Sequence, residues 1–143
     1  MTENEIAKQC CETMWSNDLA SQDLGMSVKV TEPGCAQASF EVRKNMVNGH
    51  DLCHGGYIFT LADSAFAFAC NTYNRVTVAA SASIEFIRPA RLGDTLVATA
   101  TEVSRGGRTG IYDATIRNQD DDVIAIFRGR SYATREPVFK SDT

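Results

Sequence analysis

The chain has 143 residues, of which 43% are hydrophobic and 22% charged, a balance typical of a soluble globular protein rather than a disordered or fibrous one. This length predicts a single domain, covering residues 1–143, with enough buried surface for a core. The 14 Lys and Arg against 18 Asp and Glu give a net charge of −4. Because a nucleic-acid-binding protein normally carries a basic surface, we expect no nucleic-acid partner.

Two helices are predicted. The first covers about residues 3–17, because Thr2 and Glu5 form a capping box and apolar side chains then recur at helical spacing. The second covers about residues 56–73 and is apolar on nearly every face, so it must be surrounded by protein. After about Arg135 the chain is predicted to be a disordered tail.

Strand-like segments make up most of the remaining chain: residues 26–30, 35–42, 76–87, 94–104, 109–117 and 123–133. Gly106-Gly107 predicts a two-residue hairpin, and the short turns between the last three segments predict an antiparallel meander. One sheet of five or six strands can curl around the apolar helix. The sequence therefore predicts an α+β fold, with a curled antiparallel sheet wrapped around one long helix.

The five cysteines form no CxxC pair, and the opening MTENEIAKQCC has neither the basic nor the apolar region of a secretory signal. We therefore expect reduced thiols and a cytoplasmic protein. The apolar run over residues 56–73 carries Asp63, whose charge would be costly inside a bilayer. We expect no membrane partner.

Asp63 lies in the middle of the apolar helix, where an unpaired charge would cost on the order of several kcal/mol. Two explanations are open. The carboxylate is either a structural group, hydrogen-bonded to a strand or facing a solvated groove, or a functional group.

The His54-Gly55-Gly56 sequence precedes this helix. Consecutive glycines let the backbone approach a ligand, and the free amides at a helix start favour negative charge. Such amides can form an oxyanion hole. The alternative is an ordinary loop-to-helix turn in which His54 caps the helix.

Gly55 and Asp63 are eight residues apart, which is about 12 Å along a helix. A reacting carbonyl must lie about 3 Å from both the base and the oxyanion donor. One chain therefore cannot bring both groups to the same carbonyl, whereas two helices packed antiparallel across a two-fold axis can. This spacing predicts a dimer with two shared sites.

Other patterns are weaker. His50, Cys53 and His54 are of metal-binding types, but they lie in an irregular loop, and we expect neither a metal nor another cofactor. Four arginines lie near predicted strand ends and either bind phosphates or are solvated charges. They are Arg88, Arg91, Arg105 and Arg108.

From about Trp15 to Ala133 the chain resembles the hot-dog-fold acyl-CoA thioesterases, and more narrowly their PaaI type, the hydroxyphenylacetyl-CoA thioesterases of phenylacetate breakdown. The segments that carry the resemblance are VNGHDLCHGGYIFTLADSAFAFACN, SIEFIRPARLGDTL, TGIYDATIRNQ and IAIFRGRS. The resemblance implies a hot-dog fold and dimers that pair into tetramers. It also implies hydrolysis of acyl-CoA thioesters, with aromatic acyl groups preferred.

The resemblance also implies roles for individual residues. The family's carboxylate on the central helix, a general base or a nucleophile, corresponds to Asp63. The amide that polarises the thioester carbonyl corresponds to Gly55, while His54 and Asn48 correspond to residues that orient the site or the attacking water.

CoA in this family lies along the subunit interface with its phosphates near basic residues. The candidates here are Gly56, Arg88, Arg105 and Arg108, and aromatic side chains are expected near the acyl pocket: Tyr57, Phe59, Phe66 and Phe68. Two other functions stay open. A hydratase or dehydratase of the same fold would use His54 with an acid, and a non-catalytic acyl-CoA-binding regulator would lack the base.

Overall fold

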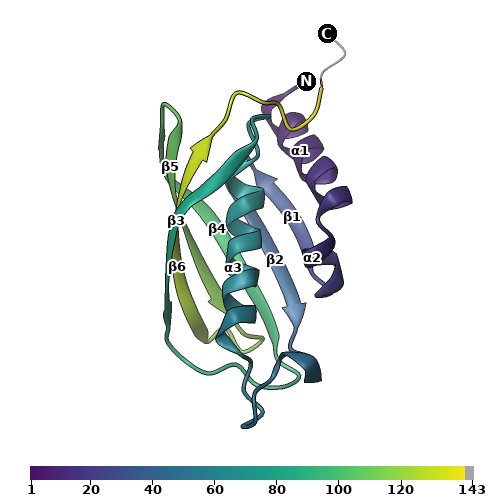
Figure 1. The fold of residues 1–143 in the computed structure, drawn as a ribbon, viewed down its shortest axis with the longest axis vertical. Helices are drawn as coiled ribbons and strands as arrows, with labels where there is room; N and C mark the ends of the chain where they lie inside the picture. Colours follow the sequence, from purple (N-terminus) through teal and green to yellow (C-terminus); the bar gives the residue numbers. More distant parts are fainter. Residues whose placement is uncertain (141–143) are drawn as a thin grey trace.

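A computed structural model describes residues 1–140 as an antiparallel six-stranded sheet that curls around one long helix (Figure 1). The helices are α1 (Glu3–Asn17), α2 (Leu19–Asp23) and α3 (Gly55–Cys70), with a 3-10 turn, η1, at Lys44–Met46. The strands are β1 (Ser27–Glu32), β2 (Cys35–Glu41), β3 (Thr77–Phe86), β4 (Thr95–Gly106), β5 (Thr109–Arg117) and β6 (Val123–Ala133). The predicted α+β fold is confirmed, with six strands.

The sheet is open and has the order β1-β2-β4-β5-β6-β3. Its last three strands in sequence are neighbours, as the predicted meander requires. The turn between β4 and β5 is displaced by one residue from the predicted position: Gly106 pairs with Thr109, so Gly107 and Arg108 form the turn. Gly107 has a φ of 61°, which suits a glycine.

The core lies between α3 and the concave face of the sheet. Nine of the 16 residues of α3 are buried, which agrees with its apolar composition. The strands contribute both large buried side chains, such as Phe40, Tyr112 and Phe127, and small ones: Ala36, Ala38, Ala98, Ala100, Ala114 and Ala125. Phe66 fills the space over Gly129 of β6, where a Cβ would lie only 2.8 Å from the ring.

The two edges of the sheet differ in how they are covered. α1 packs against β1 and places Trp15 against Phe68 of α3, with 6.4 Å between the ring centroids. The other edge, β3, is exposed at every position except Thr77 and Ile84, although its sequence is mostly apolar. β3 pairs with β6 on one side only, so its other side is a sheet edge with exposed apolar side chains and no strand partner within residues 1–140.

The ends of the helices explain where the prediction was right and where it was not. α1 has its predicted bounds, and the Oγ1 of its N-cap Thr2 accepts from the Glu5 amide at 3.1 Å. α3 begins at residue 55 and ends at residue 70, three residues before the predicted end. Asn71 ends it, because its Nδ2 donates to Thr77 O at 2.9 Å and its Oδ1 accepts from Thr77 N at 2.8 Å.

The segment predicted to be a disordered tail is described as far as residue 140, and it makes hydrogen bonds to residues just before β3. Glu136 O accepts from the Val76 amide at 2.7 Å, and the Phe139 amide donates to Asn74 Oδ1 at 2.9 Å. Residues 141–143 lie outside the described part of the chain. All five cysteines are free thiols. Within residues 1–140, no helix is both long and apolar enough to cross a membrane.

Candidate active site

One side of α3 is less covered than the rest. Thr60, Asp63 and Ala67, spaced three and four residues apart, are only partly buried, whereas most of the helix is enclosed by the sheet. The most polar residue of α3 therefore lies on its accessible side.

The carboxylate of Asp63 has no hydrogen-bond or ion-pair partner among residues 1–140. Burial raises its pKa, and the charge of Asp18 raises it further. Asp18 is itself held in place, because it accepts from the amide and the hydroxyl of Ser21 at 3.0 and 2.6 Å. Asp63 is thus a partly desolvated carboxylate that no strand hydrogen-bonds, which leaves its oxygens free to accept a proton.

The start of α3 contains the predicted cap. His54 Nδ1 accepts from the Gly56 amide at 3.1 Å, so that amide is already occupied. The Gly55 amide, by contrast, has no acceptor in the described part of the chain. The Phe86 ring lies directly over Gly55, where an added Cβ would be 3.0 Å from it. Of the two glycine amides, only that of Gly55 is free to bind a developing oxyanion.

Asn48 lies in the loop before α3. Its Oδ1 accepts from the amides of His50 and Leu52, at 2.9 and 3.3 Å, and so fixes this loop. Its side-chain nitrogen has no acceptor among residues 1–140. Asn48, Gly55 and Arg88 line one open groove of about 390 Å³. The structure therefore brings these three predicted site residues together at the start of α3.

Asp63 does not line this groove. It lies on the same uninterrupted helix as Gly55, two turns further on, which keeps the two groups about 12 Å apart. α3 is continuous between the two residues, so the separation expected from helix geometry applies within one chain.

The arginines form two separate groups. Arg88 lies beside the start of α3, whereas Arg105 and Arg108 line a small pocket near its C-terminal end. Arg75, which the sequence did not single out, lines the same pocket. The Arg105 guanidinium stacks on the Tyr73 ring, 3.6 Å from the centroid.

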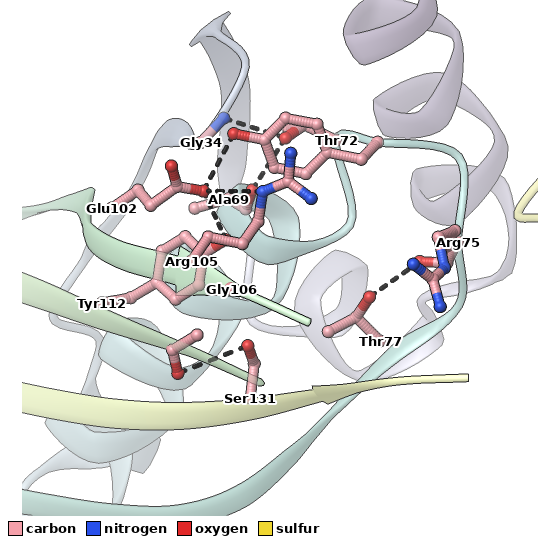
Figure 2. A network of polar contacts seen from close by, with 12 residues as sticks. Gly34, Ala69, Thr72, Arg75, Thr77, Glu102, Arg105, Gly106, Tyr112 and Ser131 are labelled. Carbon is pink, nitrogen blue, oxygen red and sulfur yellow. Dashed lines mark hydrogen bonds and ion pairs between the residues drawn. The ribbon is translucent and has the colours of Figure 1, made fainter. Parts of the chain in front are cut away.

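Figure 2 shows the polar network behind this pocket. Glu102 Oε1 accepts from the hydroxyls of Tyr73 and Tyr112, each at 2.8 Å, and Arg105 Nε lies 3.6 Å from it. Three arginines line the pocket, and one carboxylate, Glu102, faces them in this network. The pocket therefore keeps a net positive charge, which suits an anion.

Two further expectations concern the chemistry of the loop and the aromatic residues. No group of three or more metal-binding side chains occurs within residues 1–140. Burial raises the pKa of Cys53 to about 11, which disfavours a thiolate ligand.

Phe66 and Phe68 were expected near the acyl pocket, but both are buried in the core, where Phe66 packs against Tyr112 and Phe127.

A six-stranded antiparallel sheet curled around one long helix is the hot-dog fold of thioesterases. Residues 50–125 match the model of the Thioesterase superfamily, and the chain belongs to this family.

Individual relatives narrow the comparison. The chain is 43% identical over 126 residues to the acyl-coenzyme A thioesterase PaaI of Escherichia coli strain K12, which covers 88% of this chain and 90% of that protein. The structure of the E. coli PaaI protein from the phenylacetic acid degradation operon matches with a TM-score of 0.92 and 40% identity, covering 95% of this chain and 99% of that one. A Streptococcus mutans protein bound to acetyl-CoA matches with a TM-score of 0.74 and 28% identity, over 78% of this chain and 90% of that one. The resemblance to the PaaI type is confirmed.

Proposed function

We propose that the protein hydrolyses acyl-CoA thioesters to the free acid and CoA. The observation that carries this proposal is the unpaired, partly buried carboxylate of Asp63 on the accessible side of α3. The E. coli relative is an acyl-CoA thioesterase, and the S. mutans relative binds acetyl-CoA, both of which support this substrate class. The phenylacetic acid degradation operon of the E. coli relative supports aromatic acyl groups, such as hydroxyphenylacetyl.

Asp63 acts by one of two routes. As a general base, it removes a proton from water while the water oxygen attacks the thioester carbonyl carbon. As a nucleophile, it attacks that carbon itself and forms a mixed anhydride that water then hydrolyses. In both routes the C–S bond breaks and CoA leaves as a thiolate, so no strong general acid is needed.

The Gly55 amide stabilises the negative charge that develops on the carbonyl oxygen. Because Gly55 and Asp63 are about 12 Å apart on one helix, the amide comes from the second subunit of a dimer. Such preorganised donors contribute about 3 kcal/mol each to catalysis. His54 supports the site indirectly, because its ring holds the Gly56 amide and so fixes the first turn of α3.

The exposed edge strand β3 is the surface on which we expect two copies to meet. Its long row of unpaired backbone groups suits antiparallel addition of a second β3 across a two-fold axis. Pairing centred on the middle of β3 places the Thr77 end of one strand beside the Phe86 end of the other. Since Phe86 lies over Gly55 and Thr77 lines the arginine pocket, the Gly55 groove then faces that pocket across the interface.

This arrangement supports a role for the arginines. A thioester bound at Gly55 lies near the arginine pocket of the partner subunit, which is lined by the partner's Arg75, the partner's Arg105 and the partner's Arg108. Their guanidinium groups suit the phosphates of CoA. Arg88 lies on the Gly55 side of the same interface. We further propose that such dimers pair into a tetramer. The five free thiols fit a reducing compartment such as the cytoplasm.

A panel of CoA thioesters, assayed for free thiol release, tests the proposed function. We expect phenylacetyl-CoA and hydroxyphenylacetyl-CoA to be hydrolysed with a higher kcat/KM than octanoyl-CoA. Equal or better hydrolysis of octanoyl-CoA would refute the aromatic preference. Hydration of an enoyl-CoA without thiol release would favour a hydratase, and tight CoA-ester binding without any turnover would favour a regulator.

A further inference from the structure

A second groove, which we call the α1–α3 groove, opens between α1 and the C-terminal half of α3. Its volume of about 390 Å³ lies in the range of pockets that hold small organic ligands. Its apolar lining residues come from four places in the chain: Met14, Ala67, Val76 and Val138. We propose that the α1–α3 groove binds the acyl group of the thioester, an inference that rests on the proposed function.

The α1–α3 groove begins one helical turn beyond Asp63 along α3. Ala67 follows Asp63 by one helical turn and lies on the same accessible side of α3. Asp18, which also lines the groove, is near enough for its charge to act on Asp63. A thioester carbonyl attacked at Asp63 therefore has its carbon substituent at the entrance of this groove.

Charge and hydrogen bonding favour an apolar acyl group over the other parts of an acyl-CoA. Asp18 is the one charged residue among those that line the groove within residues 1–140, and its negative charge repels phosphate. Asn71 also lines the groove, but its amide is fully used by Thr77 and by Ala67 O. The interior therefore offers apolar contact, whereas the positive charge lies in the separate arginine pocket.

Two walls of the groove come from outside residues 50–125, the part that matches the family model. Met14 belongs to α1, and Val138 belongs to the C-terminal segment. α1 is held firmly, because Cys10 is buried and Trp15 packs against Phe68. The selection of the acyl group thus depends on segments added to the common fold, and Met14 and Ala67 set the width of the groove.

Narrowing the groove tests this inference. We expect Ala67→Leu to lower kcat/KM for phenylacetyl-CoA by about tenfold or more, because a pocket distinguishes groups that differ by a methylene by about 10- to 200-fold. For acetyl-CoA, whose acyl group is too short to reach the added side chain, we expect a change of less than about twofold. Val76→Phe narrows the groove from the opposite wall, and folding should tolerate it because Val76 is 37% exposed.

Ala20→Leu is the matched control, because it makes the same chemical change at an exposed position of α2. It should leave both substrates unaffected. An equal loss for acetyl-CoA and phenylacetyl-CoA would overturn the inference, since the groove would then hold the pantetheine arm. An unchanged ratio, or a change of oligomeric state in size-exclusion chromatography, would also overturn it. If the wild type hydrolyses neither ester, the proposed function itself is wrong.

Discussion

The middle of α3 and its C-terminal end each have a partly buried carboxylate beside them, and the two carboxylates have opposite surroundings. At the C-terminal end, Glu102 accepts two tyrosine hydroxyls and faces Arg105 (Figure 2). In the middle of the helix, Asp63 has no such partner within residues 1–140, and the like charge of Asp18 adds to burial in raising its pKa.

This difference supports our proposal that Asp63 is a functional carboxylate, whereas Glu102 is a structural one. Donors around a carboxylate repay the cost of removing it from water, so Glu102 ties β4 and β5 to the end of α3. A carboxylate that is desolvated without donors destabilises the fold, and such groups are characteristic of sites where chemistry occurs. Burial alone does not distinguish the two groups, whereas hydrogen bonding does.

Asp63→Asn should have the largest effect. Asn keeps the shape of the side chain but can neither accept the proton nor attack, so we expect kcat to fall about 10²- to 10⁴-fold with little change in KM. The measurement is thiol release from phenylacetyl-CoA by the folded variant. Retention of more than about a tenth of the wild-type kcat would leave less than about 1.4 kcal/mol for Asp63, which is too little for the proposed role.

The same variant should be more stable than the wild type at neutral pH. The folded state raises the pKa of Asp63, so the unfolded chain ionises more readily and stability falls as the pH rises through this range. Asn removes that destabilisation. We expect Asp63→Asn to raise Tm at pH 7, and the gain to disappear below the ordinary pKa of 3.8, where Asp63 is protonated in both states. A lower Tm at pH 7 would identify Asp63 as a structural group.

The second effect concerns the β3 edge. Ala82→Glu places a charge at an exposed position in the middle of β3, where two copies would bring like charges together. We expect light scattering to show monomers, and activity to be lost although the circular dichroism spectrum is unchanged. Ser104→Glu, at an exposed position of β4, is the control and should change neither. A fully active Ala82→Glu monomer would refute the shared site.

Glu102→Ala gives the opposite result to Asp63→Asn. It leaves the hydroxyls of Tyr73 and Tyr112 without their acceptor, which should lower the free energy of unfolding by about 1–3 kcal/mol. We expect kcat to change little, and Glu102→Gln, which retains an acceptor oxygen, to restore most of the stability. Chemical denaturation and thiol-release assays measure the two effects. A large loss of kcat in a folded Glu102→Ala variant would show that Glu102 is not merely structural.

The smallest effect is expected from Asp18→Asn. Removing this charge should lower the pKa of Asp63, because Asp18 is one of the two causes that raise it. Asn can still cap α2 through its side-chain oxygen, so the fold should be kept. The acidic limb of the pH–rate profile should therefore move to lower pH, with kcat at neutral pH little changed. A limb that stays in place would mean that Asp18 does not act on Asp63.

Sequence patterns predicted the parts of this molecule that depend on local interactions. The capping box at Thr2 fixed the start of α1, and alternating or apolar runs located all six strands. The distance between Gly55 and Asp63 could also be predicted, because helix geometry alone sets the separation of two residues on one helix. The short helix α2 was missed, since five residues offer no periodicity to detect.

The remaining features depend on contacts that no pattern in the sequence marks. Asn71 ends α3 through Thr77, and no local signal marks the bond between them. Arg75 joins Arg105 and Arg108 only because the end of α3 meets the β4–β5 turn. The sequence offered two interpretations of His54-Gly55-Gly56, a helix cap and an oxyanion hole, and it could not decide between them. The hydrogen bond from the Gly56 amide to His54 Nδ1 forms the cap and leaves the Gly55 amide as the free donor.

The five free cysteines have a consequence for an enzyme whose product is itself a thiol. The pKa of every one of them is raised, chiefly by burial, to about 11 for Cys53 and to about 12 for Cys70. Thiol–disulfide exchange proceeds through the thiolate, which is scarce at neutral pH when the pKa is raised. We therefore expect thiol–disulfide exchange between these cysteines and a disulfide of CoA to be slow at neutral pH.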